Sequence, residues 1–203
     1  SRGDSTLRGH GVLEPEAINN ELGPFDATLH VPAFFEGGRT TINGVHFLNG
    51  TPVHKTQFAK DRTFGYTTSS LDLWLEHKSQ GRISAENVSR LNIDFLNDAL
   101  RSQNGAEKLI QWLSSLSGNQ SVVVDAETPE HLGILASAIK SLIGKKRFLF
   151  RSAASFINAL AEISPKQLPP NDLGALRLLN SWGEPKPGLV LVGSHVELAD
   201  AQL

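Results

Sequence analysis

The chain has 203 residues, of which 39% are hydrophobic and 20% charged, and its formal net charge at pH 7 is −2. This length can bury a sizeable core, and the balanced charge lacks the basic excess of nucleic-acid-binding domains. The absence of cysteine excludes disulfides, thiolate catalysis and cysteine-ligated zinc or iron–sulfur sites. No apolar run approaches the roughly 18 residues of a membrane-spanning helix, so we expect no membrane partner and a cytoplasmic location.

The chain opens on Asp4–His10, a segment typical of an anion-binding turn. Arg8 offers a planar fork that matches a carboxylate or a phosphate bidentately. Ser5 and Thr6 supply short donors, and Gly9 lets backbone amides approach a ligand. From these residues alone, we expect a small anion to bind here.

The first half of the chain predicts a strand, a hairpin and a helix. Ala27–Ala33 is typical of a strand and runs into a polar loop that contains two glycines. Asn49-Gly50, between the strand-like runs Val45–Leu48 and Thr51–His54, is the strongest short hairpin signal. A cluster of threonine and serine residues then favours the start of a short helix over Leu71–His77.

The second half alternates strands and helices. Gln120–Asp125 is a short apolar run that ends in an acid, a pattern typical of a parallel strand buried on both faces. Thr128 as N-cap and Pro129 as first helical residue open a helix that extends to about Ile143. This alternation predicts an α/β layered fold with a largely parallel sheet and a local β-hairpin. The remaining predicted elements are the strands Ser89–Ile93, Arg147–Phe150 and Gly188–Val192, the helices Ala106–Leu116 and Ala153–Ile163, and a short helix Leu173–Leu179 within a linker over 164–187.

In open parallel sheets, ligands bind beyond the carboxyl ends of the strands. If the strands are neighbours, Arg8, Arg39 and Arg151 converge on a pocket for an anionic substrate. Otherwise each arginine caps a helix or pairs with a surface acid. The loops that qualify as sides of such a pocket are Asp4–His10, Phe35–Thr41, Asp125–Thr128 and Arg151–Ser155.

Asp4 and Asp125 are the acids best placed to act as a base. Asp125 ends a buried strand, where desolvation raises the proton affinity of a carboxylate, although it can instead cap the following helix. Asp61 lies in a polar loop, where it either orders the loop through Arg62 or touches a ligand. The histidines show no metal-binding spacing, so no metal site is predicted. His10 is of interest because it closes the opening segment.

Neither a dinucleotide fingerprint nor a Walker A loop is present. Gly9-His10-Gly11 lacks the last glycine of the fingerprint, and Gly144-Lys145-Lys146 has no hydroxyl residue after the lysine. Gly193-Ser194, at the start of a predicted helix, is a weaker candidate for holding phosphate through backbone amides.

The following motifs occur in this order along the chain: Arg2-Gly3-Asp4-Ser5-Thr6-Leu7-Arg8-Gly9-His10, Pro32–Thr41, Thr56–Asp61 with Phe64-Gly65-Tyr66, Val124-Asp125-Ala126, Arg151–Phe156 and Leu191–His195. This succession resembles the four-carbon acid sugar kinases and covers nearly the whole chain. The resemblance implies a two-domain, cytoplasmic kinase that uses ATP with Mg²⁺ to phosphorylate the terminal hydroxyl of threonate, erythronate or similar acids.

The resemblance also implies residue roles. Asp4 is the candidate catalytic carboxylate, which orients or deprotonates the attacking hydroxyl, and Arg8 is the candidate partner of the sugar's carboxylate. Ser194 would approach ATP. The full set of candidate substrate-binding residues, with Arg39 added from its chemistry, is Asp4, Ser5, Thr6, Arg8 and Arg39.

The implied domain division places the acid-sugar-binding N-terminal domain at residues 1–180. Residues 181–203 would form the linker and the start of the nucleotide-binding C-terminal domain. Because the chain has no methionine, we expect an internal piece of a longer protein. The family's first strand would precede Ser1, and its nucleotide loops would follow Leu203. We therefore expect the piece alone to bind substrate poorly and not to turn over.

Two other classes of function stay open. One is a non-catalytic sensor, in which the domain binds an acidic metabolite and regulates a partner. The other is an acid-sugar isomerase or hydrolase that uses Asp4 with His10. Binding of ATP separates the kinase from the sensor, and product formation without ATP would indicate the third class. The sequence leaves the oligomeric state open.

Overall fold

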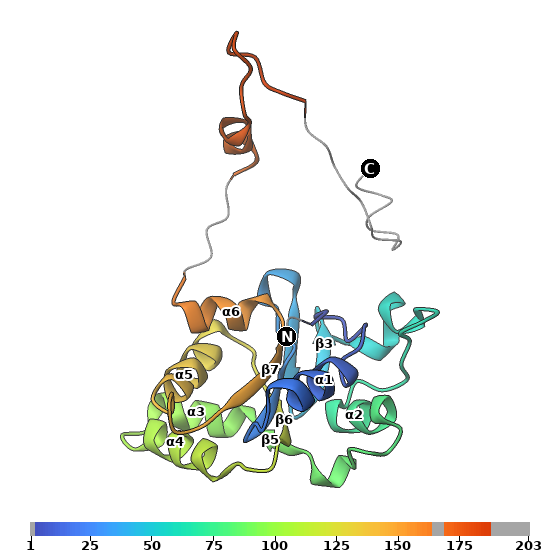
Figure 1. Ribbon diagram of the computed structural model, residues 1–203, viewed down its shortest axis with the longest axis vertical. Coiled ribbons are helices and arrows are strands. Elements are labelled where there is room, and N and C mark those ends of the chain that lie inside the picture. Colours follow the sequence, from blue (N-terminus) through green and yellow to red (C-terminus); the bar gives the residue numbers. More distant parts are fainter. Residues whose placement is uncertain (1–2, 164–168, 188–203) are drawn as a thin grey trace. The chain divides into compact units, whose positions relative to one another are not determined.

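Four parallel strands form the central sheet of the computed structural model, which describes residues 3–163 and 169–187 (Figure 1). The order of the strands is β5-β6-β1-β7, so β1 is central and pairs with β6 on one side and β7 on the other. This sheet confirms the predicted α/β layered fold with a parallel sheet. The strands are β1 Ala27–Val31, β5 Ser89–Leu91, β6 Gln120–Val124 and β7 Phe148–Ser152.

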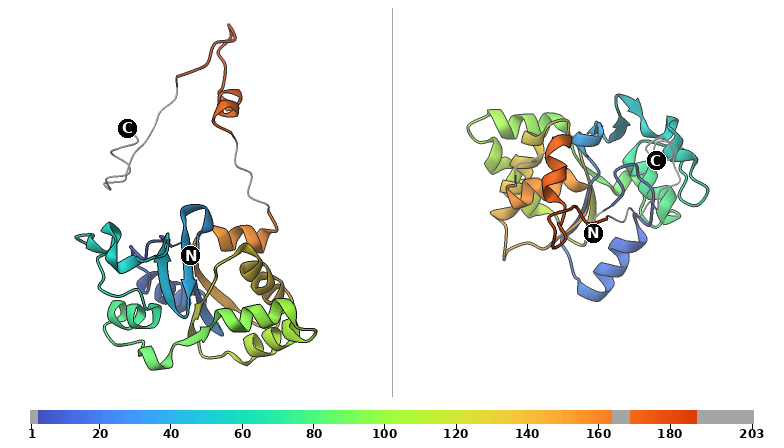
Figure 2. Two further views of the ribbon diagram at one scale, coloured as in Figure 1. Left: turned by 180° about the vertical axis from the view of Figure 1, so that it is seen from behind. Right: turned by 90° about the horizontal axis from the view of Figure 1, so that it is seen from above.

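Helices cover both faces of the sheet (Figures 1 and 2). The helices α3, α4, α5 and α6 lie on one face, and α1 and α2 lie on the other. The sequence of strand β6 is continuously apolar because both of its faces are buried. Val122 and Val124 pack into the core on the α3–α6 face, whereas Val123 packs into the core on the α1–α2 face. The helices are α1 Leu13–Leu22, α2 Leu71–Ser79, α3 Ile93–Arg101, α4 Gly105–Ser115, α5 Pro129–Lys140 and α6 Ala154–Ala161.

A small antiparallel sheet lies next to the carboxyl end of β6. It consists of β2 (Arg39–Ile42), β3 (Val45–Leu48) and β4 (Thr51–Pro52). The predicted hairpin is confirmed, with Asn49 at φ 48 and Gly50 at φ 75, the left-handed pair that a tight hairpin requires. Thr41 pairs with Ala126, which ties this sheet to the carboxyl end of β6.

Several predicted segments differ from the structure. Of the predicted strand Thr51–His54, only Thr51–Pro52 is a strand, and Val53–Lys55 forms a 3₁₀ helix. Phe35–Thr41, expected as a loop, contains a 3₁₀ turn over Phe35–Gly37 followed by β2. Arg39 and Phe34 exchange backbone hydrogen bonds of 2.9 Å in both directions, and these bonds turn the polar segment into an ordered hairpin end. In the linker, the short helix begins earlier than predicted, as a 3₁₀ helix over Pro170–Leu176.

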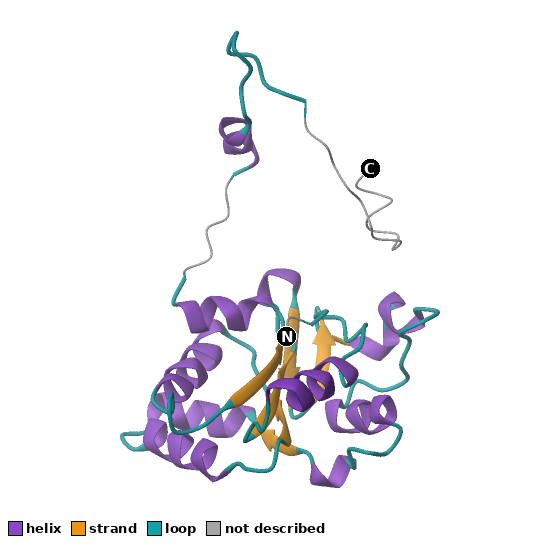
Figure 3. Cartoon of the chain, viewed as in Figure 1, coloured by secondary structure: helices purple, strands orange, loops and turns teal. Residues whose placement is uncertain are grey.

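The chain divides into two compact units, Ser1–Ile163 and Ser164–Leu203. Figure 3 shows the sheet and its helices in the first unit. The predicted strand Gly188–Val192 and the candidate ATP residue Ser194 lie outside the described residues. Within the described ranges, every helix is too short or too polar to cross a membrane.

Candidate functional site

The first described residues lie across the carboxyl edge of the central sheet. The Gly3 N–H donates to the Ser152 carbonyl at the end of β7 (2.7 Å), and the Ala153 N–H donates to the Val31 carbonyl at the end of β1 (3.0 Å). A Cβ on Gly3 would come within 2.8 Å of Arg151 Nε, so the Arg151 side chain would have to move to admit a larger residue. The opening segment therefore lies at the edge of the sheet where ligands bind in such folds.

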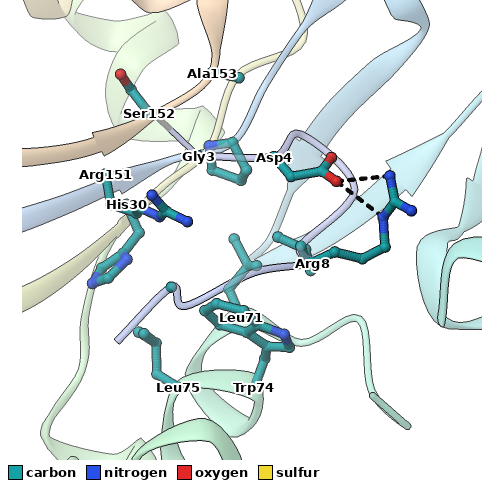
Figure 4. Close-up of a pocket in the computed structure, with 13 residues that line it drawn as sticks. Gly3, Asp4, Arg8, His30, Leu71, Trp74, Leu75, Arg151, Ser152 and Ala153 are labelled. Atoms are coloured by element: carbon teal, nitrogen blue, oxygen red, sulfur yellow. Dashed lines mark hydrogen bonds and ion pairs between the residues drawn. The ribbon is translucent and has the colours of Figure 1, made fainter. Parts of the chain in front are cut away.

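Asp4 organises the loop that follows. Its Oδ1 accepts hydrogen bonds from the Thr6 N–H and from Thr6 Oγ1, each at 2.7 Å. Its Oδ2 accepts from Arg8 Nε and Arg8 Nη2, each at 2.9 Å (Figure 4). Leu7, between these partners, has a φ of 63 and is buried. We name residues Asp4–Arg8 the acid loop, since one carboxylate fixes its shape.

Two side chains distant in sequence hold the acid loop from outside. The Tyr66 hydroxyl donates to the Thr6 carbonyl at 2.5 Å, and His46 Nε2 lies 2.8 Å from the Ser5 carbonyl. Because a carbonyl only accepts, His46 carries its proton on Nε2, and its Nδ1 accepts from the Thr41 hydroxyl at 2.9 Å. Complete burial lowers the pKa of His46 to about 4, so this neutral tautomer persists at pH 7.

Arg8 and Arg39 both lie against Phe58. The Arg8 guanidinium carbon is 5.1 Å from the centre of the Phe58 ring, and that of Arg39 is 5.8 Å away. Arg39 also lies 5.9 Å from the centre of the Phe34 ring. Contacts of this length are within cation–π range. The structure thus brings Arg39 to the same edge of the fold as the acid loop.

The larger of two pockets at this edge has a volume of about 320 Å³. Asp4 and Ser5 of the acid loop line one side, and Phe34 lines another. The third side, Ala153 and Ala154, is the N-terminal end of α6, where Ala153 provides no side-chain cap. The N–H groups of an uncapped first turn favour negative charge, so this pocket suits a small hydroxylated anion.

A smaller pocket of about 30 Å³ lies beneath the acid loop (Figure 4). Arg8, Arg151, His30 and Trp74 are among its lining residues. Arg39 lines neither this pocket nor the larger one, so the predicted convergence of the three arginines on one pocket is wrong. Arg151 is ion-paired with Glu14. The atoms His30 Nε2 and Trp74 Nε1 are buried and have no hydrogen-bond partner among the described residues. The space admits one or two water molecules and is too small for a sugar acid.

Asp125 has a structural role that differs from both of its predicted ones. Its carboxylate accepts from the backbone N–H groups of Asn43 (2.7 Å), Gly44 (2.9 Å) and Ile93 (3.1 Å). It is almost fully buried and neither lines the two pockets nor caps α5. Burial raises its pKa, against the opposing effect of the three N–H donors. Thr128 is the N-cap of α5, with Pro129 in its first turn, as predicted.

Asp61 and His10 occupy the rim near Arg8. Asp61 accepts from the N–H groups of Thr63 and Phe64, each at 2.9 Å, and its Oδ2 lies 3.6 Å from Arg8 Nη1. The Asp61 carboxylate thus orders its own loop through these backbone N–H groups, whereas ordering the loop through Arg62 was one of its two predicted roles. It also faces Arg8. His10 packs edge-on against Phe64, with ring centres 5.1 Å apart. In the part of the chain that the structure describes, no cluster of acidic or histidine side chains could hold a metal ion.

Fold and site together define an α/β domain in which a loop ordered by Asp4 lies at the carboxyl edge of a parallel sheet. Residues 1–160 match the family described as the sugar-binding N-terminal domain, and the chain belongs to this family. The match confirms the resemblance to the four-carbon acid sugar kinases.

Three curated relatives carry names of such kinases. A 3-oxo-tetronate kinase of Brucella melitensis is 30% identical over 139 residues, and a D-threonate kinase of Cupriavidus necator is 30% identical over 145 residues; each alignment covers 68% of this chain and 30% of the relative. A D-erythronate kinase of Heliobacterium modesticaldum is 29% identical over 136 residues, covering 66% of this chain and 28% of the relative. The chain thus spans under a third of their length.

Two solved structures share the fold. A protein of Haemophilus influenzae has a TM-score of 0.60 at 18% identity, over 88% of this chain and 40% of that one. A domain of unknown function from Bordetella bronchiseptica, solved with bound citrate as a domain-swapped dimer, has a TM-score of 0.60 at 26% identity, over 79% of this chain and 35% of that one. Both likenesses agree with the α/β architecture.

Proposed function

We propose that this chain forms the substrate-binding half of an ATP-dependent kinase for four-carbon acid sugars. The observation that carries the proposal is the 320 Å³ pocket, which lies between the acid loop and the uncapped first turn of α6. Pockets of this size are typical for small ligands. The names of the relatives, 3-oxo-tetronate, D-threonate and D-erythronate kinase, indicate the substrate class. A cytoplasmic location belongs to the same proposal.

In this proposal, Asp4 orients the attacking hydroxyl of the sugar acid. Phosphoryl transfer needs little covalent chemistry from the protein and depends on positioning and on neutralising charge. The Asp4 side chain is held by Thr6 and Arg8, yet it is 32% exposed, so its carboxylate can still accept a hydrogen bond from a ligand. Ser5 lines the same pocket, and Thr6 shapes the loop through its two bonds to Asp4.

ATP would supply the phosphoryl group, and Ser194 is the proposed nucleotide contact. Mg²⁺ would enter with ATP, coordinated in part by its phosphates, and the proposal assigns it no ligand among residues 3–163 and 169–187. The proposal therefore gives the described residues one task. They bind the acid and present its hydroxyl.

An ADP-release assay of the intact protein tests the activity. The panel contains D- and L-threonate, D- and L-erythronate and 3-oxo-tetronate, and the matching four-carbon polyols serve as controls without a carboxylate. We expect ADP release with at least one acid and none with the polyols. Binding of an acid without any binding of ATP, measured by calorimetry, would instead support the sensor. Conversion of an acid without ATP would support the isomerase or hydrolase.

A further inference from the structure

Arg8 and Arg39 differ in how fully their charge is offset. Arg8 directs both Nε and Nη2 at Asp4 Oδ2, each at 2.9 Å, and its Nη1 lies 3.6 Å from Asp61. Its Nε also lies 3.1 Å from Thr6 Oγ1. A guanidinium binds a carboxylate best through two parallel N–H groups. In Arg8 these groups face acids of the protein itself.

Arg39 is charged and half-buried, yet among the described residues it has neither a hydrogen bond nor an ion pair through its side chain. Its Nε is fully buried and unpartnered. Burial lowers the pKa of Arg39, although an arginine stays protonated at pH 7. A partly buried charge that makes no ion pair is unfavourable, and the more distant Asp4 charge opposes the effect of burial on Arg39. A ligand carboxylate would remove this cost.

The backbone around Arg39 is shaped to hold its guanidinium. A Cβ on Gly37 would lie 1.8 Å from Arg39 Nη1 and 2.7 Å from the Phe34 ring, so the guanidinium occupies the space that only glycine leaves free. The two hydrogen bonds between Phe34 and Arg39 fix the start of β2. Phe34 itself lines the 320 Å³ pocket. Arg39 itself is not among the residues that line this pocket, and it reaches the pocket's edge through its contact with the Phe34 ring.

We propose that Arg39 binds the carboxylate of the acid sugar and that Arg8 is a positioning residue that holds Asp4. This inference rests on the proposed function, since it takes a hydroxy acid as the ligand. One end of the ligand then meets a guanidinium that makes no ion pair among the described residues, and a hydroxyl meets Asp4. Arg39 therefore sets the preference for an acid over a polyol.

The test compares an acid with its matching polyol. Calorimetry of the intact protein measures the binding of erythronate against erythritol, or of threonate against threitol, for the wild type, Arg39→Gln and Arg8→Gln. We expect Arg39→Gln to weaken acid binding by about 10- to 100-fold, the usual worth of a charge-assisted hydrogen bond, and to leave polyol binding unchanged. Arg8→Gln should weaken both ligands by a similar factor, because it acts through Asp4. Arg39→Lys should recover part of the acid preference.

Two further outcomes separate the inference from the proposed function. If the wild type binds no four-carbon acid, the proposed function fails and the role of Arg39 fails with it. If the acid binds but Arg39→Gln keeps the preference while Arg8→Gln loses it, the roles of the two arginines are reversed and only this inference is overturned. Gly37→Ala keeps the Arg39 charge but displaces the guanidinium. If Arg39→Gln folds poorly, Gly37→Ala should show the same weakening of acid binding.

Discussion

Burial decides the protonation state of two histidines close to the site. Burial lowers the pKa of His30 and of His46 to about 4 each. The Arg151 charge acts in the same direction on His30, and Arg39 acts so on His46, whereas Asp4 and the bond to the Ser5 carbonyl oppose it there. Both imidazoles are therefore neutral in the folded protein at pH 7.

The folded chain should lose stability as the pH falls from about 6.5 towards 4. The unfolded chain binds protons at these histidines near their ordinary pKa of 6.5, and the folded chain does not, so acid favours unfolding. The contribution of the two histidines to the free energy of unfolding is fully present above pH 6.5. Its loss approaches roughly 3 kcal/mol per histidine at pH 4. Urea unfolding at pH 7, 5.5 and 4.5 measures it. His77→Gln, at an exposed histidine, should keep the pH dependence, and a flat profile in the wild type contradicts the prediction.

Two glycines give opposite predictions for the same change. Gly37→Ala would force apart Arg39 and Phe34, and we expect weaker acid binding. Gly133 lies in the exposed surface of α5 with nothing within 4 Å of a built Cβ. Gly133→Ala should raise the free energy of unfolding by about 0.5–1 kcal/mol, because alanine favours helix, and leave acid binding unchanged. Thermal unfolding and calorimetry of both variants check the pair, and equal effects on binding would contradict it.

Single residues were predictable where their partners are near in sequence. Asp4, Thr6 and Arg8 lie within five positions, so the composition of the segment already indicated a ligand-binding turn. The bonds of Asp125 to Asn43 and Gly44 cross more than 80 positions, and no local pattern signals them. The same holds for His46, whose partner Ser5 lies 41 positions away. Tyr66 belonged to a recognised motif, but its bond to Thr6 was not foreseen.

At the level of elements, side chains from distant segments of the chain hold the acid loop in place. Tyr66 and His46 reach two consecutive carbonyls of the loop, those of Thr6 and Ser5. Most of the loop's own bonds converge on Asp4, and one more joins Arg8 Nε to Thr6 Oγ1. The loop is therefore fixed in shape by Asp4 and fixed in place by the other two side chains.

Tyr66→Phe should loosen the acid loop without unfolding the domain. The change removes one hydrogen bond to a backbone carbonyl, worth about 1 kcal/mol, and keeps the ring. We expect faster amide hydrogen exchange at Thr6 and Leu7, and a higher KM for the acid at a nearly unchanged kcat. His54→Gln is a matched control, because His54 bonds Ser69 rather than the loop. Unchanged exchange in Tyr66→Phe would show that Asp4 alone fixes the loop.

Among the described elements, α1, α3 and β2 were not predicted from the sequence. The helix α3 carries a usable signal, because Asn92 caps it through Phe95 at 2.9 Å and Ile93, Leu96 and Ala99 recur at helical spacing. The helix α1 is weakly amphipathic and buries only Pro15, so its pattern is faint. Strand β2 is short and polar, and it forms because β3 and Ala126 supply its partners.

At the scale of the whole molecule, the class of fold was predictable and the order of strands was not. Alternating strands and helices indicated a parallel sheet. The order β5-β6-β1-β7 arises from pairings between distant segments, such as Ala27 with Gln120 and with Phe148. The predicted meeting of the acid loop and the Arg151–Ser155 segment depends on this order, since β7 lies directly beside β1. The predicted domain boundary at 180 stays a prediction.

The two units should differ in their resistance to a protease that cleaves after large apolar residues. In the second unit, Leu178 is 76% and Trp182 is 84% exposed, whereas in the first unit Trp74 is 5% exposed and Phe156 is fully buried. Cleavage needs exposed, poorly packed chain. Brief chymotrypsin treatment should therefore cut first between 176 and 182, and mass spectrometry of the products identifies the sites.

The trimmed product should bind the acid as tightly as the uncut chain. The candidate contacts Asp4, Arg8 and Arg39 all lie in the first unit, so the cuts leave the acid loop, β2 and α6 intact. Calorimetry with the four-carbon acid before and after trimming measures the effect. A chain with Leu178→Ser, Leu179→Ser and Trp182→Ser serves as the control, since it removes preferred sites without touching the pocket. First cuts between 27 and 152, or loss of acid binding on trimming, would show that the first unit needs the second for its integrity.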